Sequence, residues 1–244
     1  MRKSVSDRAT RQGGIGLTAS FQKFNFSTKP EVDERTLSMM TPEDEPNALS
    51  SPAERERRIG MLNQPHIEPL CKYLQTIKAQ HPEKDLPSFD PCDGGVFARS
   101  LFLLEAPGPK AVDSAFISRN NPDPSARNIC GFLQKANISR RDTLLWNIVP
   151  WYVGNENRIR AVTKEDIEQS LPYLEELVGL LPLLKVIVLV GKKAQSANIE
   201  MQKLTNTSMI NTHHPSQRVF NMWPQKKDEM REHLAQVAAI LNND

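Results

Sequence analysis

Short apolar runs and stretches of helical spacing alternate along most of this chain. Four apolar runs of strand length predict β-strands, and the third is apolar on both faces, as expected for a strand buried within a parallel sheet. The stretches between these runs carry helical spacing or helix-start residues and predict helices. Strands are expected at 96–104, 143–149, 185–190 and 208–212, and helices from residue 52 and at 65–79, 124–137, 163–181, 192–204 and 224–241.

Helix-start residues support this order of elements. Pro124 follows Asp123 at the start of one predicted helix, and Thr163 with Asp166 resembles a capping box at the start of another. Strands that alternate with helices imply crossover connections and a sheet covered on both faces. We therefore expect the α/β class, with a three-layer α/β/α sandwich around a central, mostly parallel four-stranded sheet.

The first 50 residues differ from the rest of the chain. They are rich in Ser, Thr, Lys, Arg, Pro and Gly and lack the apolar periodicity that repays the entropy of ordering. We expect a flexible basic and polar arm at residues 1–50 and a single domain at residues 51–244. The arm either keeps the protein soluble or binds nucleic-acid phosphates and bases through its cations and Phe21, Phe24 and Phe26.

Composition limits the partners of the protein. Charge is nearly balanced, with 31 Lys and Arg against 29 Asp and Glu, so a polyanion has to be held by a local cluster of cations. Three cysteines without a C-x-x-C pair indicate a reducing compartment and predict neither disulfides nor a structural zinc. The polar start and the lack of a long apolar run predict a cytoplasmic protein with no membrane segment.

Polar side chains of catalytic type stand where the predicted strands end. Glu105 and a Pro-Gly turn follow the first strand, Asn147 lies in the second, and His214 follows the fourth. Ligands of parallel sheets bind beyond the carboxyl ends of the strands, so we expect these three side chains to converge. A buried amide without a partner costs about 1–3 kcal/mol, so Asn147 either holds a neighbouring loop or awaits a ligand.

Four motifs in this order resemble the uracil-DNA glycosylase superfamily, and most closely its branch with a Gly-Glu-Ala-Pro-Gly motif and an iron–sulfur cluster. The resemblance covers about residues 96–240, and four motifs in series are much more specific than one. The motifs are Glu105-Ala106-Pro107-Gly108, Asn147-Ile148-Val149-Pro150 with Asn157-Arg158 beyond it, Val190-Gly191-Lys192-Lys193-Ala194, and His214-Pro215-Ser216.

The chain also departs from that branch. Leu104 stands in place of the leading Gly, Gln217 stands in place of the Pro after the last motif, and the Glu-Asp pair expected after the first motif is missing. The cysteines that bind the cluster are missing too. We therefore expect a relative with no cofactor and no metal.

The resemblance implies a role for each motif. Glu105 and His214 are the expected catalytic residues. Glu105 stabilises the cationic sugar and orients the attacking water, and His214 donates a hydrogen bond to O2 of uracil. Asn147 reads the polar edge of the base, and Phe116 stacks on it. Second choices for stacking are Trp151 and Tyr152, and the base-binding set is completed by Ala106, Pro107 and Gly108.

A base in a duplex has to flip out before it can enter such a pocket. Arg218 stands where related enzymes carry a wedge residue, and it either fills the resulting gap or is an ordinary surface charge. DNA contacts are expected from Lys192, Ser216, Gln217 and Arg218, and further candidate phosphate ligands are Lys110, Arg119, Arg127, Arg158 and Lys193.

These expectations together describe a monomeric DNA repair glycosylase. It hydrolyses the N-glycosidic bond of uracil, or of another deaminated base, in single- or double-stranded DNA and leaves an abasic site. Two alternatives remain open. One is a DNA-binding module of the same fold, with weak or no turnover, that recognises modified bases or abasic sites. The other is a hydrolase of a small nucleoside or amide, which needs no cationic groove. Ser216 is not expected to be a nucleophile, because no Gly-x-Ser-x-Gly elbow is present.

Overall fold

The computed structural model describes residues 45–155 and 158–243. The chain divides into residues 1–40 and 41–244, and all described residues belong to the second part. Most of the predicted arm, with its cations and phenylalanines, lies outside the described residues. Its last residues form the 3₁₀ turn η1 (Ala48–Ser50), where the Leu49 side chain is buried and the Leu49 N–H donates to the carbonyl of Asn120 at 3.2 Å.

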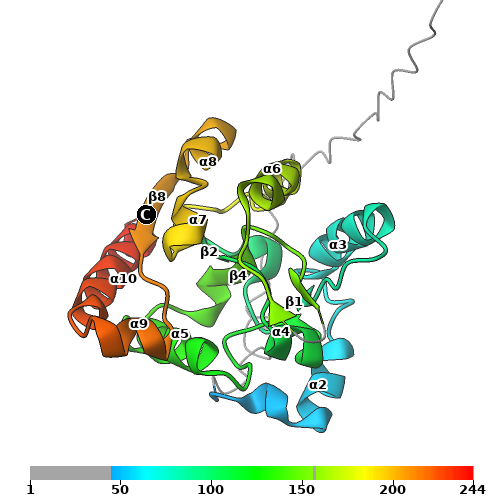
Figure 1. The fold of residues 1–244 in the computed structure, drawn as a ribbon, viewed down its shortest axis with the longest axis horizontal. Coiled ribbons are helices and arrows are strands. Elements are labelled where there is room, and N and C mark those ends of the chain that lie inside the picture. Colours follow the sequence, from blue (N-terminus) through cyan, green and yellow to red (C-terminus); the bar gives the residue numbers. More distant parts are fainter. Residues whose placement is uncertain (1–44, 156–157, 244) are drawn as a thin grey trace, which may run out of the picture. The chain divides into compact units, whose positions relative to one another are not determined.

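The core of the fold is a sheet of four parallel strands in the order β4-β2-β7-β8 (Figure 1). The chain passes from β2 to one neighbour, β4, and then returns to the other side of β2 to form β7 and β8. All four runs predicted as strands contribute one strand each, which confirms the α/β class. The strands are β2 (Ser100–Leu104), β4 (Thr143–Asn147), β7 (Val186–Val190) and β8 (Ser208–Thr212).

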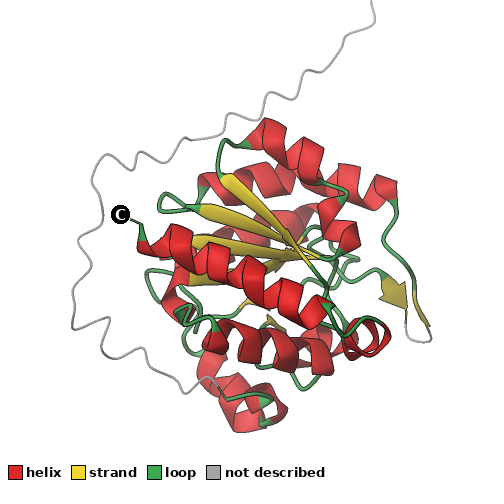
Figure 2. Cartoon of the chain, turned by 90° about the vertical axis from the view of Figure 1, so that its left-hand side faces the viewer, coloured by secondary structure: helices red, strands yellow, loops and turns green. Residues whose placement is uncertain are grey.

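Helices cover both faces of this sheet (Figure 2). On one face α6 packs against both α3 and α8, and on the other α5, α9 and α10 pack against one another. The architecture is the predicted α/β/α sandwich. The helices are α3 (Glu68–Gln80), α6 (Lys164–Gly179) and α8 (Asn198–Leu204) on the first face, and α5 (Pro124–Lys135), α9 (Gln217–Met222) and α10 (Lys226–Asn242) on the second.

Three predicted helix starts are confirmed, whereas the helices expected from residues 65 and 224 begin at Glu68 and Lys226. The carboxylate of Asp123 accepts the N–H groups of Ser125 and Ala126 at 2.9 and 3.0 Å and so caps α5. Thr163 and Asp166 form a complete capping box at the start of α6. Ser51 caps the charged helix α2 (Pro52–Ile59).

Several predicted elements differ in extent. The expected helix at 192–204 is two short helices, because the hydroxyl of Ser196 donates to the carbonyl of Lys193 and competes with the helical hydrogen bonds. The first strand begins only at Ser100, after a 3₁₀ turn. The two short helices that replace the expected helix at 192–204 are α7 (Lys192–Gln195) and α8. Besides α9, the pattern did not predict these short elements: β1 (Ser88–Phe89), η2 (Gly95–Phe97), α4 (Pro109–Ser114), β3 (Phe116–Ile117), η3 (Arg140–Asp142), β5 (Gly154–Asn155) and β6 (Arg158–Ile159).

A buried network of ion pairs joins segments that are distant in sequence. Arg58 in α2 binds Asp90, and the Nη2 atom of Arg140 also lies 2.6 Å from that carboxylate. Asp93 lies 3.0 Å from Nε of Arg140 and 3.7 Å from Nη2 of Arg119. Burial raises the pKa of Asp93 to about 6, whereas at Asp90 the guanidiniums of Arg140 and Arg58 outweigh burial and hold the pKa below its usual range.

Among the described residues, no helix has the length and apolar character needed to cross a lipid bilayer.

Candidate active site

The carboxyl ends of the neighbouring strands β2 and β4 carry two of the predicted site residues, Glu105 and Asn147. Leu104, the last residue of β2, pairs in register with Asn147, the last residue of β4. Past this pair, the N–H of Ile148 donates to the carbonyl of Leu104 at 2.8 Å and the N–H of Val149 to that of Glu105 at 3.1 Å. Pairing therefore continues beyond the strands and fixes the backbone from which Glu105 extends.

His214 reaches the same edge of the sheet from β8. The N–H of Gly191, just after β7, donates to the carbonyl of Thr212 at 2.8 Å, so the two strand ends are joined. Gly191 has a φ of +90°, and a Cβ there would lie 2.9 Å from Cβ of His214. Only glycine allows this close approach, which brings His214 against the turn after β7.

A cavity of about 380 Å³ opens at these strand ends, a volume typical of small-ligand sites. Asn147 and His214 both line it, together with the turn of the first motif. Asn147 is only 3% exposed, and its Nδ2 has no hydrogen-bond partner among the described residues. We call this space the strand-end cavity; its lining includes Ala106, Pro107, Gly108, Ile117, Ser118, Asn121, Asp123, Asn147 and His214.

One wall of this cavity lies outside the four motifs and was not predicted. It consists of the segment after β3 and the start of α5, and Asn121 is fixed there by Ser114, whose hydroxyl donates to its Oδ1 at 2.6 Å. Asp123 lines the cavity as well as capping α5. The run of four polar residues at 118–121, directly after the apolar residues Phe116 and Ile117, is a feature that could have revealed this wall.

A second hollow of about 400 Å³ adjoins the first. Glu105 lines this second hollow and not the strand-end cavity, whereas His214 lines both, so the expectation that all three side chains converge on one cavity is wrong for Glu105. Three lysines contribute to it, and Glu105 is the one acidic residue in the described lining. We call it the lysine cleft; its lining includes Glu105, Gly191, Lys192, Lys193, His213, His214, Trp223 and Lys226.

Burial and two nearby carboxylates determine the protonation of the His214 imidazole. Burial lowers the pKa of its imidazole, and the nearby carboxylates of Glu105 and Asp123 act in the opposite direction without cancelling that effect. His214 therefore stays neutral near pH 7, when one ring nitrogen donates and the other accepts. The adjacent residue, His213, forms a hydrogen bond with Glu229 on α10 and not with His214.

The Glu105 side chain is attached to the segment before α6. The N–H of Val162 donates to Oε1 of Glu105 at 3.4 Å, and the carbonyl of Val162 accepts from Nζ of Lys193 at 2.6 Å. One peptide segment thus links the end of β2 to the start of α7, and Thr163 immediately begins α6 with its capping box.

The prediction for the stacking residue does not fit the structure. Phe116 is fully buried and does not line the strand-end cavity, whereas the next residue, Ile117, does. Successive residues of a strand point to opposite faces, and in β3 the aliphatic side chain is the one on the cavity side. Trp151 is also fully buried, against the ring of His81 at 4.9 Å between centroids, and neither Trp151 nor Tyr152 lines either hollow.

The predicted DNA-contact residues lie in different surroundings. Ser216 caps α9 by accepting the N–H of Val219 at 3.3 Å, and Gln217 and Arg218 are exposed on the first turn of that helix. Lys192 is exposed at the lysine cleft. Lys110 lines the strand-end cavity, Lys193 lines the lysine cleft, and Arg127 lines a separate hollow between α5 and α10.

The prediction that Arg119 is a candidate phosphate ligand is wrong. Its side chain is wholly buried in the ion network with Asp93, and its Nη2 also donates to the hydroxyl of Thr143. Asn157 and the Arg158 side chain lie outside the described residues.

The cysteines do not fit an iron–sulfur cluster. Cys71 lies in α3, Cys92 follows β1, and Cys130 lies in α5. Within residues 45–155 and 158–243, no three His, Cys, Asp or Glu side chains are grouped so that they could hold a metal ion.

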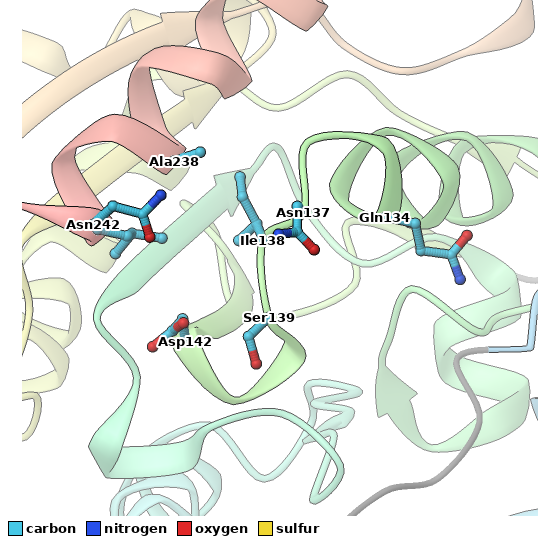
Figure 3. A pocket seen from close by; sticks show the side chains of 8 residues that line it. Gln134, Asn137, Ile138, Ser139, Asp142, Ala238 and Asn242 are labelled. Atoms are coloured by element: carbon cyan, nitrogen blue, oxygen red, sulfur yellow. The ribbon is translucent and has the colours of Figure 1, made fainter.

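A further hollow of about 500 Å³ lies away from the strand ends (Figure 3). Ser139 and Asp142, from the segment that leads into β4, and Asn242, at the end of α10, line it. It therefore lies near the amino end of β4, whereas Asn147 stands at the carboxyl end of the same strand. None of the predicted site residues lines it.

Comparison with known proteins identifies one family. Residues 94–238 match the uracil DNA glycosylase superfamily, a span of more than half of the chain that contains all four strands of the sheet as well as Glu105, Asn147 and His214. No curated protein matches the chain in sequence.

Proposed function

The chain belongs to the uracil-DNA glycosylase superfamily, and from this membership we propose that it hydrolyses the N-glycosidic bond of uracil, or of another deaminated base, in DNA. One observation carries the proposal. The buried amide of Asn147 has an unpartnered Nδ2 in a cavity that His214 also lines. A buried donor without a partner is costly, and the polar edge of a pyrimidine would satisfy it.

The two adjoining hollows suggest how the nucleotide is divided between them. The flipped base occupies the strand-end cavity, where Asn147 and His214 meet its polar edge. The sugar and the attacking water occupy the lysine cleft, where Glu105 lies. His214 lines both hollows and so stands beside the bond that breaks.

In the reaction, the bond between N1 of the base and C1′ of the deoxyribose breaks, and its electron pair leaves with the base. The Glu105 carboxylate stabilises the positive charge left on the sugar and orients the water whose oxygen bonds to C1′. The proton released from this water ends on the departing base. Neutral His214 donates a hydrogen bond to the oxygen on which negative charge collects, and it keeps its own proton.

DNA contacts outside the two hollows come from the segments around them. Lys192 at the lysine cleft binds a backbone phosphate near the flipped nucleotide. Arg218, exposed on α9 just after His214-Pro215-Ser216, enters the gap that the flipped base leaves.

The test is excision from oligonucleotides that contain uracil, in single and double strands, followed by alkaline cleavage at abasic sites. The wild-type protein should produce strand breaks. Glu105→Gln and His214→Ala should each slow excision by about 10² to 10⁴, the usual effect of removing such a group. Glu68→Gln, on the exposed face of α3, is the matched control and should leave the rate unchanged. Absence of product from any deaminated base would exclude the glycosylase.

A DNA-binding module with weak or no turnover is the second candidate. It is favoured by the aliphatic Ile117 in the strand-end cavity, which no Phe, Tyr or Trp side chain of the described residues lines. Binding of uracil-containing or abasic DNA in a mobility-shift assay, without release of base, would support this candidate. The small-molecule hydrolase is disfavoured, because Lys192, Lys193 and Lys226 around the lysine cleft suit a polyanion.

A further inference from the structure

An exposed aromatic side chain stands at the end of α9. Trp223 is 40% exposed, and its neighbour Met222 is 54% exposed. Only two other large apolar side chains in the described part of the chain, Ile59 and Ile199, are comparably exposed, and each stands alone. Exposed aromatic surface beside a functional site commonly marks a contact with a ligand or partner.

The surroundings of Trp223 are cationic. The Nζ atom of Lys226 lies over one face of the Trp223 ring, 4.3 Å from its centroid, so a base has to stack on the other face or displace this side chain. Lys192 and Lys193 line the same lysine cleft. The Lys193 side chain donates to the carbonyl of Val162, whereas no hydrogen bond or ion pair joins the Lys192 side chain to another described residue. An aromatic ring with one cation over a face and two more in the same cleft suits a chain of bases joined by phosphates.

We propose that Trp223 is a stacking platform for an unpaired base next to the flipped nucleotide, so that the preferred substrate is single-stranded DNA. This inference rests on the proposed function, because the lysine cleft also contains His214 and Glu105. A single strand has bases free to stack on an indole ring, and every base has a face that can do so. In a duplex the neighbouring bases are already stacked and paired, and the ring has to compete with those contacts.

The chain provides its own probe for this contact. It has three tryptophans, and Trp146 and Trp151 are fully buried. Quenching of tryptophan fluorescence by DNA therefore reports on Trp223. The oligonucleotide should contain only undamaged bases, so that the measurement does not depend on excision.

The experiment titrates the full-length protein with an undamaged single-stranded oligonucleotide and with its duplex, following tryptophan fluorescence and the anisotropy of a dye on the DNA. The single strand should quench the wild-type protein and bind more tightly than the duplex. Trp223→Leu should abolish the quenching and weaken single-strand binding about tenfold, and Trp223→Phe should restore part of the affinity. Ile199→Ala, which removes an exposed apolar side chain on α8, is the matched control and should bind as the wild type does.

The outcomes separate this inference from the proposed function. Quenching by single strands with no excision of any deaminated base would leave the platform intact and exclude the glycosylase. Excision without quenching, or equal affinity of the wild type and Trp223→Leu for single strands, would exclude the platform alone. Equal quenching by duplex and single strand would overturn the single-strand preference. Self-association of the protein that Trp223→Leu abolishes, with no quenching by DNA, would make Trp223 a protein contact and overturn the proposal.

Discussion

Opposing effects act on the pKa of His214, and mutation can separate them. Burial lowers its pKa, whereas Glu105 and Asp123 raise it. Glu105 cannot be removed without affecting the reaction, whereas Asp123 takes no part in the proposed reaction steps. It acts on His214 through its charge, caps α5 and lines the strand-end cavity. Asn is as good a cap as Asp, so Asp123→Asn changes the charge and keeps the helix start.

We predict that Asp123→Asn moves the acid limb of the pH profile of kcat/KM to lower pH. Because the reaction needs a neutral imidazole, activity is lost as pH falls through the pKa of His214, which burial holds below its usual value in the wild type. Removing a carboxylate lowers that pKa further, so activity persists to lower pH. NMR titration of the imidazole should show the same shift, and an unchanged or raised acid limb would contradict this account. Urea unfolding should confirm that α5 keeps its stability.

Prediction from sequence worked best for residues attached to strand ends. Asn147 is the last residue of β4 and His214 follows β8, as the motifs and apolar runs indicated, although their roles stay predictions. Phe116 could not be assigned, because β3 has only two residues and no periodicity to show which of its side chains faces the cavity. Arg119 could not be assigned either, since its partner Asp93 is distant in sequence.

At the scale of elements, the start of α6 serves both stability and the site. Its capping box follows directly after Val162, which donates to Glu105. Apolar periodicity and start residues predicted α6 and the longer helices correctly. The short α4, α7 and α9 were missed or merged, because helices of four to six residues are too short for a repeating apolar face.

We predict that Thr163→Ala lowers the free energy of unfolding by about 1 kcal/mol, the usual cost of losing an N-cap hydroxyl. The N–H of Asp166, which now donates to the Thr163 hydroxyl at 3.3 Å, loses its partner. Thr163→Ser keeps the hydroxyl and should be close to the wild type. Urea denaturation of the three proteins provides the measurement, and equal loss in the Ala and Ser variants would show that the cap is not responsible.

At the scale of the whole molecule, the buried ion network joins α2, the loop after β1, the segment after β3 and the start of β4. Asp90 binds both Arg58 and Arg140, and its side chain is completely buried. Removing one member of a buried ion pair is far more costly than removing an exposed one, because the remaining charge stays desolvated.

We predict that Asp90→Ala destabilises the protein by about 3–5 kcal/mol, because two guanidiniums lose their shared carboxylate. Asp90→Asn, which keeps the hydrogen-bond acceptor, should cost less. Glu68→Ala breaks the exposed pair with Lys72 and should cost less than about 1 kcal/mol. Urea midpoints measure all three, and similar effects of Asp90→Ala and Glu68→Ala would show that the network adds little.

The same network has a consequence for where the domain can be cut. Asp90 and Asp93 both precede residue 94, where the family match begins, whereas Arg119 and Arg140 follow it. A fragment trimmed to residues 94–238 would retain Glu105, Asn147 and His214 but deprive both arginines of these carboxylates. It would also lose α3, whose apolar face is part of the core. We expect such a fragment to be degraded or insoluble when expressed, because the segment that relatives share is smaller than the one that folds.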